Sequence, residues 1–238
     1  MKILCWTPVI YDRKGFPRED NKPFISGEKL KEAIESALVY YYIKKDKSLE
    51  NKVKHYLLKE KLEPEEVAKE VKKLVWERYD WVKSINFPEK IFISSEGLSE
   101  RIVEVFDLEK WRDVEDFKVE SFKGEIELSF SEEIMEKLKA PCMSYAEALA
   151  KIETSMLKDH PLVEKFYHPL LNQLKRWKAP IRLGLWTEVK YEGNLLFFWR
   201  IKEVRERILK DYGIDIRPKR VLFFPRERAT AGWCEITW

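Results

Sequence analysis

The chain has 238 residues, of which 45% are hydrophobic and 37% charged, so it can form one large or two small cores and is too apolar to be disordered. Its net charge is only +3, and no run of 18 apolar residues occurs of the kind that a membrane-spanning helix needs. Abundant lysine and glutamate with a single glutamine are typical of growth at high temperature.

The N-terminal sequence lacks the long apolar core and small-residue cleavage site of a secretory leader, so we expect a cytoplasmic protein that does not contact a membrane. The cysteines, Cys5, Cys142 and Cys234, are odd in number, far apart and outside any CxxC motif. This spacing indicates neither a zinc ribbon nor a disulfide scaffold. We expect no metal and no other cofactor, and no small-molecule substrate is evident from the sequence.

The first third of the chain predicts one strand and three helices. Residues 2–10 read as a strand, followed by a polar loop over 11–23. A helix opens after Gly27, where apolar residues recur at helical spacing. Two further amphipathic helices are predicted over 48–61 and 63–79.

The centre of the chain predicts a short strand and a β-hairpin. Residues 90–94 are apolar enough for a strand, and residues 117–130 alternate around a two-residue turn at Lys123-Gly124. That turn would place Ser121 opposite Ile126 and Val119 opposite Leu128 on one apolar face.

The last hundred residues predict two helices and then a mixed segment. Residues 144–158 begin with a capping box, and a second helix over 162–177 is interrupted or restarted at Pro169. Residues 181–238 read β-β-α-β-β, with Gly213 capping the helix. Because strands and helices do not alternate regularly, we predict the α+β class with antiparallel sheets.

The positive charge is concentrated near the C-terminus. Residues 176–238 hold fourteen Lys or Arg against eight Asp or Glu, a net charge of +6, which leaves −3 for the first 175 residues. The whole chain has fourteen arginines, and nine of them lie in this segment, interleaved with aromatic residues. Arginine binds phosphate and aromatic rings stack on bases, so this tail is a candidate RNA surface. A merely solvated basic face, with the aromatic side chains packed in the core, is the alternative.

The stretch "KPFISGEKLKEAI" resembles the signature that opens the first helix in the RAMP superfamily of CRISPR-associated RNA-binding proteins. Two C-terminal segments, "PIRLGLWTEV" and "PKRVLF…TAGWCEI", resemble segments of type III-A (Csm) effector subunits, most closely the subunit that caps the 3′ end of the guide RNA. The residues that match the first signature are Pro23, Ile25, Gly27, Leu30, Lys31, Ala33 and Ile34. Ser26, Glu32 and Ser36 depart from it.

The resemblance implies a ferredoxin-like (RRM-like) RAMP fold, built as two such units with inserted helices. We place the first unit over residues 1–130 and a helical segment with the second unit over 131–238. It also implies a non-catalytic RNA-binding subunit of a type III interference complex, whose partners are single-stranded guide RNA and other effector subunits. The expected RNA-binding residues are Lys14, Gly27, Lys29, Lys31, Arg182, Gly184, Lys190, Arg220, Arg226 and Arg228.

The start of the helix after Gly27 has two interpretations. Helix N-terminal amides lack intrahelical partners and attract anions, and a glycine lets a phosphate approach the backbone closely. Alternatively, Gly27 only permits the turn, Ser26 caps the helix and Glu28 complements its dipole.

Two other functions remain open at this point. Some RAMP proteins are metal-independent endoribonucleases, which need a general base and acid, often a histidine with a tyrosine or lysine. No histidine precedes His55 in the chain, and we interpret His55, His160 and His168 as ordinary polar positions. The second alternative is a scaffold subunit with little RNA contact.

Overall fold

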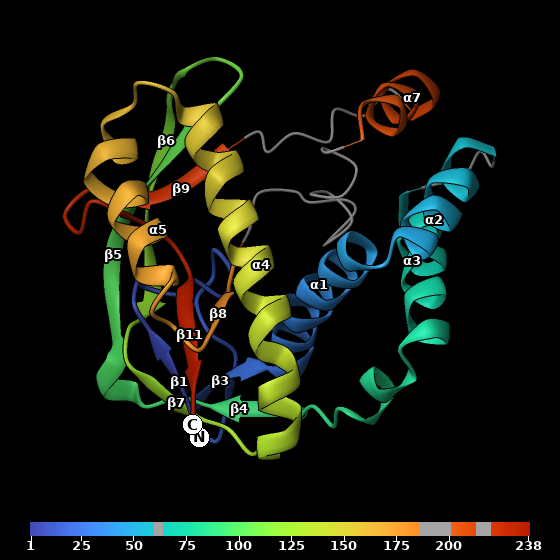
Figure 1. The fold of residues 1–238 in the computed structure, drawn as a ribbon. Helices are drawn as coiled ribbons and strands as arrows, with labels where there is room; N and C mark the ends of the chain where they lie inside the picture. Colours follow the sequence, from blue (N-terminus) through green and yellow to red (C-terminus); the bar gives the residue numbers. More distant parts are fainter. Residues whose placement is uncertain (60–63, 186–200, 213–219) are drawn as a thin grey trace.

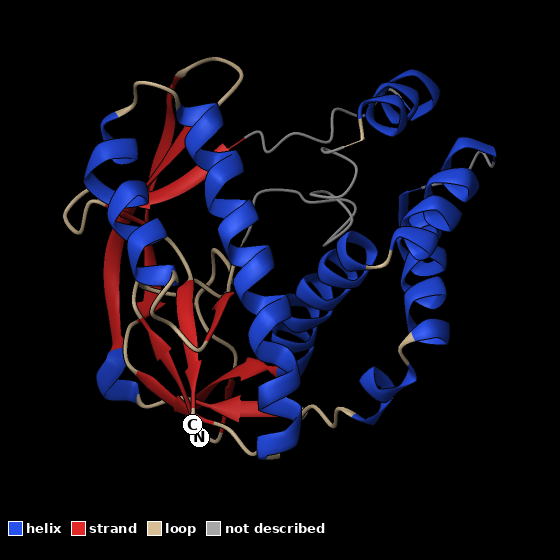
Figure 2. Ribbon diagram, in the orientation of Figure 1, coloured by secondary structure: helices blue, strands red, loops and turns tan. Residues whose placement is uncertain are grey.

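The computed structural model describes residues 1–59, 64–185, 201–212 and 220–238 (Figure 1). The described residues form three antiparallel sheets together with helices, which confirms the α+β class. Figure 2 shows the strands gathered on one side of the molecule and α1 (Gly27–Lys45), α2 (Lys47–Lys59) and α3 (Pro64–Arg78) on the other. None of the described helices is both long and apolar enough to cross a membrane.

The first sheet joins the two ends of the chain. Its strand order is β7-β1-β11-β8, and all neighbours are antiparallel. Ile3 lies opposite Ile236 in this sheet, and both are fully buried. The N- and C-termini consequently lie side by side (Figure 1). The bounds of these strands are β1 Lys2–Cys5, β7 Glu125–Glu127, β8 Ala179–Arg182 and β11 Trp233–Thr237.

The second sheet is built on a long hairpin. Its order is β10-β9-β5-β6, and β5 and β6 are joined by a turn that Asp107 shapes by accepting the amides of Glu109 and Lys110 at 2.9 and 2.8 Å. Val103 and Val105 of β5 are buried in a core of their own with residues of β6 and β9. The bounds are β5 Leu98–Asp107, β6 Arg112–Phe122, β9 Arg220–Phe224 and β10 Ala229–Thr230.

The hairpin predicted at Lys123-Gly124 is therefore wrong. β6 pairs with β5, whereas β7 pairs with β1 in the other sheet, so the Lys123-Gly124 bend passes the chain from one sheet to the next. The alternation did identify the buried face, because Val119 and Ile126 are both buried. Alternation predicts which face of a strand is buried, but it does not specify the neighbouring strand.

The third sheet leads into α1. Its order is β2-β3-β4, and Ile25 of β3 lies opposite Ile91 of β4. The predicted strand 90–94 and the predicted helix after Gly27 are both confirmed. The bounds are β2 Arg18–Glu19, β3 Lys22–Ser26 and β4 Lys90–Phe92.

Two helices in the first third of the chain confirm the amphipathic pattern. The predicted helices 48–61 and 63–79 correspond to α2 and α3, which bury one stripe each, including Val53 and Val71. A short 3-10 helix, η1 (Asp80–Ser84), follows α3, and another, η2 (Ser95–Gly97), precedes β5.

The helix predicted over 144–158 is longer than expected. α4 (Glu132–Leu157) begins twelve residues earlier, where the hydroxyl of Ser131 accepts the amide of Ile134. Ser144 lies in mid-helix and is no cap. The apparent capping box at Ser144 misled the prediction, because the helix continues through Pro141 and buries Leu138 and Cys142 in the core.

The C-terminal third confirms most of the predicted elements. The segment 162–177 forms a π-helical turn, η3 (Val163–Tyr167), followed by α5 (His168–Leu174), and α7 (Lys202–Tyr212) precedes β9. Leu209 of α7 is apolar but 52% exposed. The second tail strand (194–200) and the Gly213 cap lie outside the described residues.

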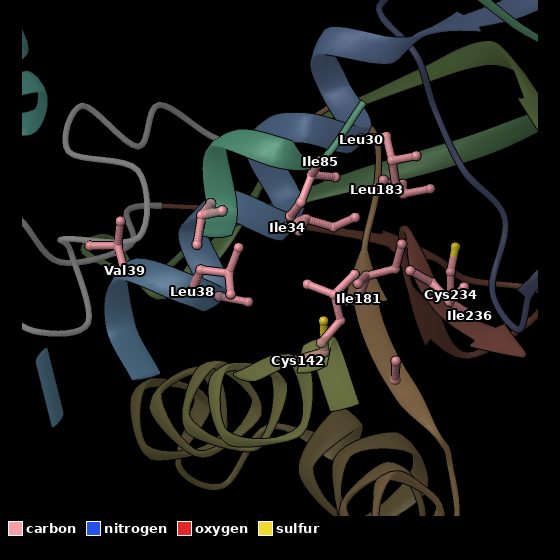
Figure 3. Close-up of a cluster of buried hydrophobic side chains, with 14 of the residues drawn as sticks. Leu30, Ile34, Leu38, Val39, Ile85, Cys142, Ile181, Leu183, Cys234 and Ile236 are labelled. Carbon is pink, nitrogen blue, oxygen red and sulfur yellow. The ribbon is translucent and has the colours of Figure 1, made fainter. Parts of the chain in front are cut away.

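Strands from both expected units share sheets. β1 from the first unit pairs with β11, and β5 pairs with β9. The division at residues 130 and 131 stays a prediction, but the two sides do not have separate sheets. The main core lies between α1, α4 and the first sheet, as Figure 3 shows for Leu30, Ile34, Cys142 and Ile181.

Candidate nucleic-acid interface

Gly27 lies at the start of α1 in tight contact with the segment before β4. Its amide donates to the carbonyl oxygen of Glu89 at 2.8 Å. A Cβ at this position would lie 1.5 Å from the carbonyl oxygen of Pro88. The glycine is therefore required by a close backbone approach within the protein, and its amide already has a partner. The phosphate interpretation must therefore account for an amide that already donates to Glu89, and the turn interpretation must add the close approach of Pro88.

A groove of about 500 Å³ lies beside this helix start. Ser26 occupies the N-cap position, but its side chain makes no capping hydrogen bond. Lys31 lies 3.5 Å from Glu28, and Lys90 lies 2.5 Å from Glu19. Positive and negative side chains alternate here, so the groove is not strongly cationic. Among the residues that line it are Phe24, Ser26, Glu28, Lys31, Phe87 and Lys90.

The loop after β1 holds one expected RNA-binding lysine, Lys14, and contacts a second, Lys29 of α1. Lys14 is exposed at the loop tip, where its backbone amide donates to the Asp12 carboxylate at 2.6 Å. The ammonium of Lys29 lies 5.0 Å from the ring centre of Tyr11, which joins this loop to the first turn of α1. Arg13 is bound to Glu115 of β6 through both guanidinium ends, at 2.6 and 2.8 Å.

Arg182 lies in the core and not on the surface. Its guanidinium forms an ion pair with Glu153 of α4, donates to the carbonyl oxygen of Ala231 at 3.0 Å and stacks 4.7 Å from the ring centre of Trp233. Tyr167 donates to the same carboxylate at 2.9 Å, and burial raises the pKa of that hydroxyl. This network joins α4, η3, β8 and β11, so we assign Arg182 a structural role.

Gly184 also has a packing role. Its φ is +113°, and a Cβ would lie 2.4 Å from the carbonyl oxygen of Ile10. The neighbouring amide of Leu185 donates to that same oxygen. The glycine therefore permits the segment after β8 to pass close to the N-terminal segment at Ile10. The remaining expected residue of this segment, Lys190, lies outside the described residues.

The turn between β9 and β10 presents two exposed arginines. Arg226 and Arg228 flank Glu227, whose carboxylate is held by Arg101 of β5 at 3.1 Å. Arg228 has a φ of +50°, which points to a tight turn. Arg220, at the start of β9, is exposed beside Asp107, its register partner on β5.

An aromatic pocket at the other end of the second sheet was missed by the sequence analysis. It has a volume of about 360 Å³ and is lined by Trp111, Lys158, Asp159, His160 and Pro161. Trp111 is 43% exposed, and the ring of His160 packs 4.6 Å from that of Phe106. Nothing in the local pattern connects residues 111 and 160, because the hairpin turn and the α4 end meet only in the fold.

The hydrogen bonding of His160 bears on the endoribonuclease alternative. Its Nδ1 accepts the amide of Leu162 at 3.2 Å, and burial lowers the pKa of the ring. The neutral ring therefore carries its proton on Nε2, which makes the outer nitrogen a donor. A general base would need that nitrogen unprotonated, so this geometry does not suit proton abstraction. In the described part of the chain, no cluster of His, Cys, Asp or Glu is placed to hold a metal ion.

Comparison with known proteins identifies a close relative of this chain. No family model matches the sequence. An uncharacterized protein of Aquifex aeolicus (strain VF5) is 45% identical over 239 residues, covering 99% of this chain and 98% of that protein. The chain belongs to the same family as this Aquifex protein.

A solved structure has a fold similar to that of this chain. The chain matches one chain of a cryo-EM structure of a Csm-crRNA-target RNA ternary complex of a type III-A CRISPR-Cas system. The TM-score is 0.60 at 14% identity, and the match covers 94% of this chain and 75% of that chain. At this identity the likeness shows a shared fold.

The expected RNA-binding residues that the structure describes fall into two groups. The packed group consists of Gly27, Arg182 and Gly184, whose backbone or side-chain groups are used within the protein. The exposed or half-exposed group contacts solvent from the β1 loop, α1 and the second sheet. Its members are Lys14, Lys29, Lys31, Arg220, Arg226 and Arg228.

Proposed function

We propose that this protein is an RNA-binding subunit of a type III CRISPR effector complex, which contacts guide RNA and neighbouring subunits without catalysis. The observation that carries the proposal is the likeness of 94% of the chain to a chain of an assembled Csm-crRNA-target RNA complex. The ferredoxin-like RAMP fold and a position at the 3′ end of the guide RNA, which the sequence motifs favour, form part of the same proposal.

The exposed cations are the proposed phosphate contacts. Lys14 and Lys29 lie on the β1 loop and the adjoining turn of α1, while Arg226 and Arg228 project from the β9–β10 turn. Lysine and arginine at such positions neutralise backbone phosphates without reading sequence. Contacts that ignore sequence suit a subunit of a complex in which the guide RNA recognises its target by base pairing.

The test combines binding, cleavage and assembly. The purified protein is titrated by fluorescence anisotropy against a labelled single-stranded RNA that carries a CRISPR repeat. The same RNA is incubated with the protein with and without EDTA and separated on a denaturing gel. We expect salt-dependent binding and intact RNA.

The outcomes separate the three candidate functions. Specific cleavage within the repeat would overturn the non-catalytic proposal in favour of the endoribonuclease. Absence of RNA binding together with co-purification of Csm-type subunits would indicate the scaffold. To test the proposed position, the protein is crosslinked to guide RNAs labelled at either end. Crosslinks confined to the 5′ end would contradict the 3′-end assignment.

A further inference from the structure

Two of the three cysteines meet across the first sheet. Cys5 of β1 lies directly opposite Cys234 of β11, although the two are 229 positions apart in the sequence. Both are buried, with 3% and 0% of their surface exposed. Figure 3 shows the Cys234 side chain pointing into the main core beside Ile181.

The hydrogen bonds around this pair define its geometry. The amide of Trp6 donates to the carbonyl oxygen of Trp233 at 2.9 Å. Trp6 follows Cys5 in the sequence and Trp233 precedes Cys234. In an antiparallel pair of strands, a hydrogen bond between these flanking residues shows that Cys5 and Cys234 themselves form a non-hydrogen-bonded pair. Cα atoms of such pairs lie about 4.5 Å apart, at the short end of the roughly 4.4–6.8 Å range of disulfides. The Cys234 thiol donates a weak hydrogen bond to the carbonyl oxygen of Gly232 at 3.4 Å.

We propose that Cys5 and Cys234 are a redox modification site, which a small-molecule disulfide converts into a cross-strand disulfide. In the first step, one cysteine thiolate attacks a sulfur of oxidised glutathione, forms a mixed disulfide and releases one glutathione thiolate. The second cysteine thiolate then attacks the protein sulfur of that mixed disulfide and releases the second glutathione. The two cysteines lose two protons and two electrons, and oxidised glutathione becomes two molecules of glutathione.

The disulfide would join the two central strands of the first sheet near both chain ends. It would close a loop of roughly 230 residues, and long loops restrict the unfolded chain more than short ones do. Intracellular proteins of organisms that grow at very high temperature are an exception to the rule that cytosolic disulfides are rare. The lysine- and glutamate-rich composition agrees with such an origin.

Burial determines when the bond forms. Burial raises the pKa of Cys234 well above its usual value, so in the closed fold little thiolate is present and no oxidant reaches it. We therefore expect the bond to form during folding or on local opening of the sheet, and to persist once the strands close over it.

The test uses the full chain, unfolded in guanidinium and refolded in glutathione redox buffer. The product is denatured, alkylated without reduction, digested with trypsin and analysed by mass spectrometry. Before alkylation, the intact refolded chain should be 2 Da lighter than the reduced chain, because two hydrogens are lost. We also expect the peptides 3–13 and 229–238 to be linked, while Cys142 in peptide 140–151 is alkylated.

Cys142 provides the matched control, because it is equally buried but faces the core from α4. Cys142→Ser should retain the linked peptides, whereas Cys5→Ser and Cys234→Ser should each lose them. Oxidised wild type and Cys142→Ser should melt roughly 5–10 °C above their reduced forms, and Cys5→Ser should show no such difference. Alkylation of all three cysteines in refolded wild type, or linkage that includes Cys142, would overturn the proposal whatever the variants do.

Discussion

The arginines of the basic tail lie in two contrasting environments. Arg182 on β8 is 8% exposed and is bound to Glu153, Ala231 and Trp233. Arg226 and Arg228, on the β9–β10 turn, extend into solvent. All three belong to one positively charged stretch of sequence, yet one stabilises the core and two are available to a phosphate.

The contrast teaches that a cluster of charge in sequence is not a cluster on the surface. β8 is an edge strand of the first sheet, but α4 packs against it and all four of its residues are buried, so a cation there needs a buried carboxylate. The β9–β10 turn lies beyond the strands, and Arg226 and Arg228 are exposed among the residues that the structure describes. Variants of these residues should therefore affect different properties, with stability on one side and RNA affinity on the other.

The largest expected effect is on stability, from Arg182→Met. The substitution leaves the Glu153 carboxylate buried without its cation, which typically costs about 3–5 kcal/mol. Urea unfolding followed by circular dichroism measures the loss. Arg226→Met serves as the control, because its side chain is exposed and a change within about 0.5 kcal/mol is expected. The contrast fails if Arg182→Met keeps wild-type stability but no longer binds RNA.

The next effect tests the packed start of α1. Outside any close contact, Gly27→Ala would stabilise a helix by up to about 1 kcal/mol. Here the new methyl group would meet the Pro88 carbonyl oxygen, so we expect destabilisation of about 1–3 kcal/mol instead. The sign of the change in urea unfolding free energy distinguishes the two cases.

Ser26→Ala is the neighbouring control for the helix start. A functional N-cap loses about 1 kcal/mol on this substitution, but the Ser26 hydroxyl makes no capping bond. We expect a change within about 0.5 kcal/mol. A loss near 1 kcal/mol would show that the hydroxyl caps α1 in solution.

The exposed arginines should affect RNA binding alone. Arg226→Ala combined with Arg228→Asn removes two charges, and asparagine tolerates the positive φ of position 228. If both bind phosphate, the slope of log affinity against log salt should become less steep by about 1.4, at roughly 0.7 per contact. Anisotropy titrations at several salt concentrations measure this slope.

Two lysines on the helices provide the control for charge alone. Lys52 and Lys69 are exposed on α2 and α3, away from the second sheet. Their joint replacement by alanine removes the same charge and should leave the slope closer to wild type. Equal losses from both double variants would mean that RNA binding follows net charge and not the β9–β10 turn.

Local chemistry explains which elements were predictable. Periodicity and end signals located α1, α2, α3, β9 and β11, since these depend on neighbouring residues. β5 was missed although Val103 and Val105 alternate and Asp107 is a typical turn residue. Partners across a sheet are set by distant segments, so the pairing of β7 with β1 and the meeting of Cys5 with Cys234 were not predictable.

The candidate site divides in the same way. Gly27 and Gly184 were expected to contact RNA, but the fold also requires glycine at both positions, because the carbonyl oxygens of Pro88 and Ile10 approach them closely. A motif of glycines and cations therefore looks the same whether it receives a phosphate or another part of its own chain. Only burial separates the two cases.

His160 is half-buried, between the buried Arg182 and the exposed Arg226 and Arg228. Its substitution should have the smallest effect of the variants proposed here. Burial lowers the pKa of its ring below the usual value near 6.5, although Asp113 opposes this. Below pH 6.5 the unfolded chain then binds more protons than the folded one, so stability decreases as the pH falls from 6.5 towards the folded pKa. Protonation also places a hydrogen on Nδ1, which ends its acceptance of the Leu162 amide.

His160→Asn tests this dependence, because the amide oxygen can replace Nδ1 as acceptor while adding no titrating group. Between pH 7.5 and 5 the unfolding free energy should decrease less in the variant than in wild type, since the carboxylates are common to both. Parallel curves would mean that the ring has the same pKa in both states. If repeat-RNA cleavage were present and disappeared in His160→Asn while binding was retained, the pocket would be an active site and the non-catalytic proposal would fail. At pH 7.5 we expect His160→Asn to keep both RNA binding and stability, because the neutral ring acts there only as a hydrogen-bond acceptor and a packing surface.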